Sequence, residues 1–290
     1  MKHHHSLVPA LLLGLLSSFT AHADDDVASV ALSPRIKVVS DQRSRGISDS
    51  LLRPGVKLGV DVAHESGLVG LVELGSVSKK QFLGSSGYNV LLGAGWRAGD
   101  PDGLHYGVGL AAELFPGAGY EAPHAFDTAT GASLNVRRTR YNSTFAVLEA
   151  GYGALDVRAL NVVSKTYRGV DTGGICGTEL QLDPTAGTAC YARGDRNSRG
   201  TWLLDLDYKI HLNSQTTLNL HAGFQRVKNF KEANLDDYAI GITHKRWGFD
   251  FTAEWIVPRA NARDLYRYQD GARLRAADNN RLVLSVARML

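Results

Sequence analysis

The sequence predicts an all-β protein, a transmembrane antiparallel β-barrel of about twelve strands that follows a cleaved signal peptide. Three observations predict this fold. The N-terminus has the three-part pattern of a secretory signal. Segments of about ten residues alternate between apolar and polar side chains, and the links between these segments are short and long in turn.

The first 23 residues have the pattern of a signal peptide that is removed on secretion. Lys2 and a few polar residues come first, an apolar stretch covers residues 7–21, and Ala21-His22-Ala23 forms an A-x-A cleavage site. The apolar stretch is shorter than the roughly 20 residues that a membrane-spanning helix needs. We therefore expect a signal peptide at 1–23 and a single barrel domain at 24–290, in the bacterial outer membrane.

Alternation with a period of two residues predicts the strands. Residues 202–211 place apolar side chains at even positions and mostly polar ones at odd positions, and residues 217–227 repeat the pattern after a short polar turn. Each segment has about the length of a tilted membrane-crossing strand. The same pattern predicts strands at 30–39, 55–63, 68–77, 88–97, 104–115, 142–152, 155–164, 202–211, 217–227, 235–245, 248–256 and 281–290.

The lengths of the links separate a barrel from a soluble β-sandwich. Short links at 64–67, 153–154 and 246–247 alternate with long ones such as 116–141 and 165–201. Bacterial outer-membrane barrels have even strand numbers, short periplasmic turns and longer outer loops, whereas a sandwich has no reason to sort its loops in this way. The inward phase of the strands near 142–164 is left open, because polar residues occur in both phases there.

The first long link resembles a known family. Residues 40–48 read S-D-Q-R-S-R-G-I-S, which is similar to the S-D-x-x-x-R-G-I-S segment of the TorF-type porins, a proteobacterial family of conserved hypothetical proteins. The likeness is clear over residues 40–77. Leu290 stands where such barrels usually end in an aromatic residue, and the insert at 165–200 is longer than in the shorter members. The resemblance implies an outer-membrane barrel that conducts small solutes, with no catalytic residues to transfer.

The polar phase of the strands supplies the candidate pore lining, which carries both signs of charge. Its members are Arg35, Lys37, Lys57, Asp61, Arg97, His105, Glu113, Asp205, Asp207, Lys209, His211, His221, Gln225, Asp250 and Glu254. One interpretation is a narrow porin that allows passive diffusion of small polar solutes or ions. The alternative is an interior closed by salt bridges, in a non-conducting barrel with a structural or surface-interaction role.

Other partners and chemistries are less well supported. We expect contact with outer-membrane lipid and small polar solutes, and no cofactor or metal. A formal net charge of +3 without a basic cluster argues against nucleic acid. His64-x-Ser66 resembles the His-x-Ser pair of outer-membrane lipid-modifying enzymes, but a tight turn explains these residues, so an enzyme is a remote alternative. The oligomeric state is left open.

The insert at 165–200 is expected to be a Gly-rich outer loop. Asp171, Asp183 and Asp195 lie in it without the spacing of an EF-hand calcium loop. Cys176 and Cys190 are the two cysteines of the chain. In the oxidising compartment beyond the inner membrane, nearby thiols are normally paired, so we expect a disulfide that stabilises the loop by about 3 kcal/mol.

Overall fold

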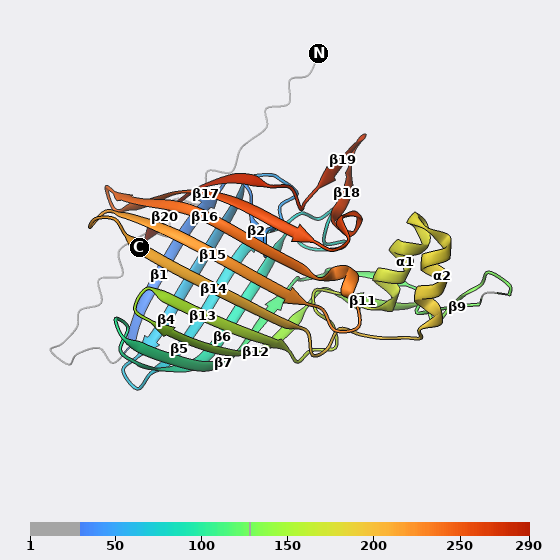
Figure 1. Cartoon of the computed structure of the whole chain (residues 1–290), viewed down its shortest axis with the longest axis horizontal. Coiled ribbons are helices and arrows are strands. Elements are labelled where there is room, and N and C mark those ends of the chain that lie inside the picture. The colour runs from blue at the N-terminus through green and yellow to red at the C-terminus, as the bar shows by residue number, and fades with distance from the viewer. Residues whose placement is uncertain (1–29, 128) are drawn as a thin grey trace, which may run out of the picture.

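The computed structural model describes residues 30–127 and 129–290, so the predicted signal peptide lies outside the described residues. Within them, no helix is long and apolar enough to cross a membrane. The described chain forms a closed twelve-stranded antiparallel barrel (Figure 1), which confirms the predicted fold. In order round the barrel, the strands are β1 (Val30–Val39), β20 (Arg281–Met289), β17 (Phe249–Ala260), β16 (Leu235–Arg246), β15 (Thr216–Arg226), β14 (Trp202–His211), β13 (Leu155–Val162), β12 (Ser143–Tyr152), β7 (Leu104–Leu114), β6 (Tyr88–Gly99), β5 (Leu68–Ser76) and β4 (Gly55–His64).

The exterior of the barrel is apolar between two aromatic girdles. Leu206 on β14 and Leu220 on β15 lie on this face, together with exposed aliphatic residues such as Ile240 on β16. Aromatic residues of the exterior gather towards the two ends of the strands, with Trp96, Tyr106, Tyr152 and Phe251 at one end and Tyr88, Trp202 and Tyr238 at the other. An apolar band between aromatic girdles is the lipid-facing surface of a transmembrane barrel. The protein is therefore an outer-membrane protein.

The two strands whose phase the sequence leaves open are oriented by their tight turn. Gly153 in this turn has a positive φ of 55°, and Tyr152 pairs with Leu155 across it. Glu149 on β12 and Arg158 on β13 pair in register and point to the interior. Alanines in the outward phase of both strands weaken the alternation, which is why the sequence pattern alone does not orient them.

Strand β17 ends four residues later than predicted, at Ala260. Pro258 lacks an N–H donor, which argues for a strand end at Ile256, yet it lies opposite Asp237 in the pair with β16. The other neighbour, β20, pairs with β17 only over Asp250–Ile256. At Pro258, the edge of β17 that faces β20 has no pairing partner. The missing N–H therefore costs no hydrogen bond between strands.

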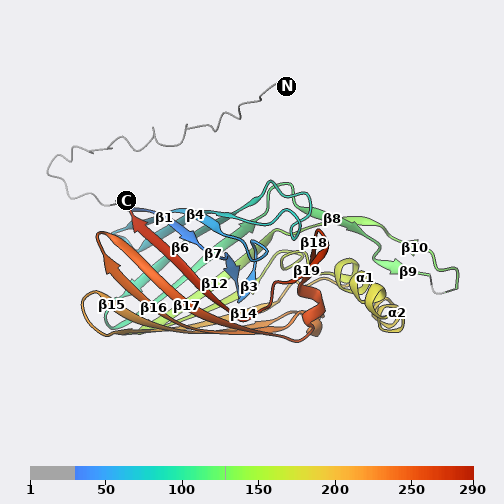
Figure 2. The same cartoon turned by 90° about the horizontal axis from the view of Figure 1, so that it is seen from above.

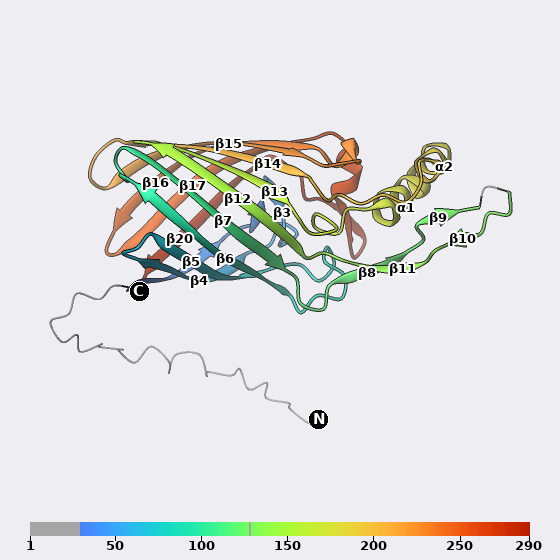
Figure 3. The ribbon, with the colours of Figure 1, turned by 90° about the horizontal axis from the view of Figure 1, so that it is seen from below.

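The long links lie at the end of the barrel opposite the C-terminus and the start of β1 (Figures 2 and 3). They contain several short strands: β2 (Arg43–Ser44), β3 (Ile47–Ser48), β8 (Gly119–Ala122), β9 (Ala125–Phe126), β10 (Ser133–Leu134), β11 (Arg137–Arg140), β18 (Arg267–Asp270) and β19 (Arg273–Ala276). Two 3-10 turns, η1 (Lys231–Ala233) and η2 (Arg263–Tyr266), complete them. By the rule of short periplasmic turns, this end faces outward from the cell.

The outer segment at 165–200 contains two helices, which the prediction of a Gly-rich outer loop did not include. Asp171 caps α1 (Thr172–Leu182) by accepting a hydrogen bond from the Gly174 N–H, and Asp183 caps α2 (Pro184–Ala192) in the same way. Asp183-Pro184 is a typical helix start, but glycines and threonines hid the pattern. The predicted Cys176–Cys190 disulfide is confirmed and joins the two helices.

The disulfide is expected to order this helical pair without being needed for the barrel, whose strands pair independently of it. Both cysteines are fully buried, between α1 and α2. The double variant Cys176→Ser/Cys190→Ser should fold and insert, but with faster proteolysis confined to the helical segment. Intact mass should show native protein two hydrogens lighter than reduced protein. Two thiols open to alkylation in folded, cell-derived protein would contradict the pairing.

Candidate functional site

The periplasmic half of the barrel interior holds a water-accessible cavity of about 670 Å³. Arg97 on β6 donates to Glu149, and Lys209 on β14 reaches Asp156, which also bonds to His105. The side chains of Arg97 and Lys209 are 52% and 54% exposed although both point into the barrel. Solvent therefore fills this half of the lumen.

Further along the lumen, two walls of opposite charge face each other across the barrel. On β1, β4 and β5, Arg35 pairs with Asp61 and Glu73, and Lys57 Nζ lies 2.9 Å from Glu73 Oε1. Lys37 lies opposite Lys57 in the β1–β4 register, so three basic side chains outnumber two acidic ones on this wall.

The opposite wall is formed by β14, β15 and β16 and is mainly acidic. There His221 bonds to Asp207 at 2.8 Å and to Asp237 at 3.2 Å. Strand β14 lies five strands from β1 round the barrel, so the acidic side chains lie across the lumen from Lys37 and Lys57.

The first outer link, loop 1 (residues 40–54), folds inward and crosses the outer third of the lumen. Its tip is the turn between β2 and β3. There Arg45 makes a bidentate ion pair with Asp205 on the far wall, with Nη2 to Oδ2 at 2.8 Å. The two side chains are only 12% and 14% exposed. The lumen is therefore narrow and nearly dry at this level, in contrast to the periplasmic half.

The residue at the tip of loop 1 has to be glycine. Gly46 has φ +70°, and a Cβ built there would lie 2.9 Å from Asp237 Cβ and 3.0 Å from Pro258 Cβ. Both the backbone conformation and the close approach to β16 and β17 exclude a side chain. Ile47, next to it, is buried against Leu235 and Ala277, which fixes the tip in the mouth of the barrel.

The base of loop 1 is held by internal hydrogen bonds and by one arginine from another loop. Asp41 accepts hydrogen bonds from Ser48 and Ser50, at 2.5 and 3.0 Å. Asp49 accepts a bidentate pair from Arg168, at 3.0 and 2.7 Å, and Arg168 also binds Glu113 on β7. Loop 1 is thus fixed to the barrel wall at two places by buried ion pairs.

Comparison of the whole chain with protein families gives a match over nearly its full length. The model described as "Bacterial protein of unknown function (Gcw_chp)" matches residues 23–288. The chain belongs to the Gcw_chp family. No curated protein matches the sequence.

Solved structures share the barrel of this Gcw_chp protein at low identity. The KdgM porin has a TM-score of 0.44 at 8% identity, covering 90% of this chain and 99% of its own. The NanC porin has a TM-score of 0.49 at 10% identity, covering 90% and 100%. The outer membrane phospholipase A from Escherichia coli has a TM-score of 0.38 at 13% identity, covering 89% and 92%. Likenesses at this level carry no argument about the activity of the Gcw_chp chain.

The structure places the sequence-predicted residues of the Gcw_chp barrel in two groups. Glu113, Asp205 and Gln225 are engaged by other segments: Glu113 by Arg168, Asp205 by Arg45, and Gln225 by Tyr167 and the Ala233 carbonyl. These three belong to the packed outer third and do not face open solvent. The others lie in the inward phase below it: Arg35, Lys37, Lys57, Asp61, Arg97, His105, Asp207, Lys209, His211, His221, Asp250 and Glu254.

Several interior charges of the Gcw_chp barrel were missed by the sequence pattern. Glu73 on β5 and Asp237 on β16 lie at inward positions of strands whose other inward residues are mostly small or apolar. Counting alternate positions along these strands would have predicted that both side chains point inward. Glu149, Asp156 and Arg158 lie on the two strands of undecided phase. The most important missed residue, Arg45, lies in a loop, where alternation gives no information about direction.

The residues considered for metal or enzyme chemistry have structural explanations in the Gcw_chp chain. Asp171 and Asp183 cap helices, and Asp195 pairs with Arg137. Within residues 30–127 and 129–290, no group of three or more His, Cys, Asp or Glu side chains is placed to hold a metal ion. His64 and Ser66 bond to each other at 2.8 Å within an exposed turn at the periplasmic end.

Proposed function

We propose that this Gcw_chp protein is a narrow outer-membrane channel of the TorF type, which allows passive diffusion of small polar solutes or ions past a constriction formed by loop 1. The observation that carries the proposal is the half-exposed state of inward-pointing charges such as Arg97 and Lys209. An interior that was only packed would hold its ion pairs buried along the whole barrel. The cavity of this half reaches Asp207, two residues along β14 from Asp205, which holds the loop 1 tip.

The alternative is a non-conducting barrel with a structural or surface-interaction role. The buried pairs Arg45–Asp205 and Arg168–Asp49 favour it, because they hold loop 1 across the lumen. The same pairs also suit a channel of small cross-section. A barrel closed along its whole length would not need a solvent-accessible periplasmic half. An outer-membrane enzyme is not favoured by any arrangement in the described part of the chain.

Single-channel recording in planar lipid bilayers tests the proposal. The refolded full-length mature protein should give discrete current steps, smaller than those of open general porins, because loop 1 limits the cross-section. Heat-modifiable migration on gels should verify that the inserted protein is folded. Well-folded protein that gives no current steps would overturn the channel and support the non-conducting barrel.

Ion preference should depend on Lys37, which faces Lys57 on the basic wall, while Glu73 is already bonded to Lys57 and Arg35. A positive side chain in a narrow lumen raises the local concentration of anions. Lys37→Gln should therefore shift the reversal potential in a KCl gradient away from anion preference. Lys37→Arg should retain the wild-type value, as should Arg288→Gln on the exterior. An unchanged reversal potential in Lys37→Gln would exclude this wall from the conduction path.

A further inference from the structure

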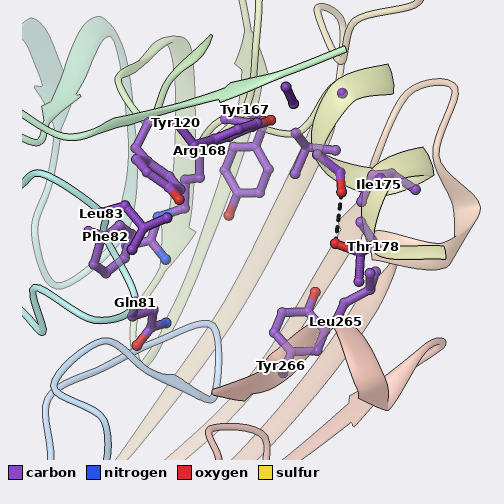
Figure 4. A pocket seen from close by; sticks show the side chains of 18 of the residues that line it. Gln81, Phe82, Leu83, Tyr120, Tyr167, Arg168, Ile175, Thr178, Leu265 and Tyr266 are labelled. Carbon is purple, nitrogen blue, oxygen red and sulfur yellow. Dashed lines mark hydrogen bonds between the residues drawn. The ribbon is translucent and has the colours of Figure 1, made fainter. Parts of the chain in front are cut away.

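A second cavity, of about 520 Å³, lies among the outer loops immediately outside the constriction. Ser44, Arg45 and Ile47 of loop 1 line it on the barrel side. Figure 4 shows Gln81 and Phe82 on one side of it and Thr178 of α1 on the other. The volume is within the range of small-molecule sites.

The lining is rich in aromatic rings and in uncharged polar groups. The rings are Phe82, Tyr120, Tyr141, Tyr167, Tyr266 and Tyr268. Amides of Gln81 and Gln181 lie among them. The Gln225 amide is already bonded to Tyr167 and to the Ala233 carbonyl, and the Thr178 hydroxyl donates to the Gly174 carbonyl. Flat rings pack against the C–H faces of a ligand, while amides and phenols exchange hydrogen bonds with its hydroxyl groups.

The cations in the lining are already neutralised. Arg45 is paired with Asp205, and Arg168 is shared between Asp49 and Glu113. Binding a phosphate or carboxylate would need one of these arginines to leave a buried partner, which costs several kcal/mol. The remaining charged side chain of the lining, Glu121, is exposed. The interior of the cavity thus suits an uncharged ligand.

Tyr266 provides a polar group that is free to bind. Its hydroxyl makes no hydrogen bond with another described residue, and in Figure 4 it points into the cavity. Burial raises the pKa of Tyr266 and that of Tyr268, so both phenols stay protonated and can donate at physiological pH. Gln81, beside them, has a buried amide oxygen without a partner. A half-buried aromatic site with an unused donor and an unused acceptor can bind a polar ligand.

We propose that this outer cavity binds an uncharged saccharide of mono- or disaccharide size. The ligand class follows from aromatic faces for the ring, hydroxyl and amide groups for its hydroxyls, and the lack of a free cation for an acid group. The proposal rests on the proposed channel in one respect, since it names the class of solute that the channel would take up. Binding itself does not require conduction, so the two can fail separately.

Isothermal titration calorimetry on the full-length mature protein tests the proposal. The protein must be held in a detergent without a sugar headgroup, such as LDAO, because glycoside detergents would occupy the site. Maltose, lactose, sucrose and trehalose are the probes, with glucuronate as the anionic probe and benzyl alcohol as the aromatic one. We expect saturable binding of at least one neutral disaccharide with a Kd of about 1 mM, equivalent to roughly 4 kcal/mol, and at least tenfold weaker binding of glucuronate.

A filled-cavity variant shows whether binding occurs at this site. A Cβ at Gly177, which lines the cavity, would have only Tyr191 Oη nearby, at 3.6 Å, so Gly177→Trp can place its ring in the cavity without a backbone clash. This variant should lose at least tenfold in affinity, and Tyr266→Phe several-fold. Ala189→Trp, on the exposed face of α2 in the same segment, is the matched control and should bind normally.

The outcomes separate the two proposals. Saccharide binding that Gly177→Trp removes supports the site, whether or not the protein conducts. Current steps without saturable binding of any of the four disaccharides overturn the site and leave the channel standing. Preferential binding of glucuronate or benzyl alcohol, or binding that Gly177→Trp does not weaken in folded protein, also overturns it.

Discussion

Replacing residues 43–48, which form the β2–β3 hairpin, with two glycines is expected to raise the single-channel conductance several-fold. The hairpin tip closes the space between the basic wall and β14, and conductance rises with the cross-section of the narrowest point. Arg45, the side chain that ties the tip to Asp205, is removed at the same time. Recording of variant and wild type in the same bilayers measures the effect. Equal conductance would mean that loop 1 is not the constriction.

A pair of glycine variants separates displacement of the tip from backbone strain. Gly46 and Gly131 have nearly the same φ, +70° and +71°, so a leucine strains either backbone to the same extent. At Gly46 the new side chain would overlap Asp237 and Pro258, whereas a Cβ built on Gly131 has no atom of another described residue within 4 Å, its chain neighbours aside. Gly46→Leu should therefore displace the tip and increase the conductance, while Gly131→Leu should leave it unchanged. The reverse order would contradict the position of the tip.

The exterior gives the largest expected effect on stability. Leu206→Arg and Leu220→Arg are each expected to lower the free energy of unfolding by about 2–4 kcal/mol, the cost of an arginine on the lipid face near the bilayer midplane. Urea unfolding in lipid vesicles, followed by tryptophan fluorescence, measures it. Asp207→Asn is the matched control, one residue from Leu206 and on the opposite face, and its amide oxygen can still accept from His221. His221→Gln is a poorer control, because His221 bonds to two carboxylates.

Comparable losses in Leu206→Arg and Asp207→Asn would argue that both faces of β14 are wet and that the strands do not cross lipid. A loss confined to the outward positions supports the membrane face assigned by alternation. The same experiment on Leu220→Arg tests the neighbouring strand independently, since Leu220 pairs with Tyr208 on the same outward face.

Much of the barrel could be predicted from the sequence because lipid on one side and water on the other impose strict alternation. Strands such as β14 and β15 follow it almost without exception. Strands β12 and β13 do not, since alanines occupy lipid-facing positions that other strands fill with leucine or valine. The sorting of link lengths depends only on the topology, so it identified the outer end of the barrel even where the alternation failed.

The constriction could not be predicted from the sequence, although the segment that forms it carries the family resemblance. The role of the R-G-I-S segment depends on the contact of Arg45 with Asp205, 160 positions away, and on the approach of Gly46 to Asp237 and Pro258. A loop residue has no periodicity that states where it points. The helices α1 and α2 were missed for a different reason, because a disulfide and buried contacts stabilise a segment whose glycines are poor helix formers.

Thiol modification during current recording tests most directly whether ions pass through the lumen of this barrel. The two native cysteines are joined in a disulfide, so Lys209→Cys, in the wet periplasmic half, provides the reactive thiol. A bulky thiol reagent added to the periplasmic side should reduce the current through Lys209→Cys channels in single steps. Tyr208→Cys, which faces lipid on the same strand, should show no change. An undiminished current through Lys209→Cys channels that mass spectrometry shows to be fully modified would contradict conduction through the lumen.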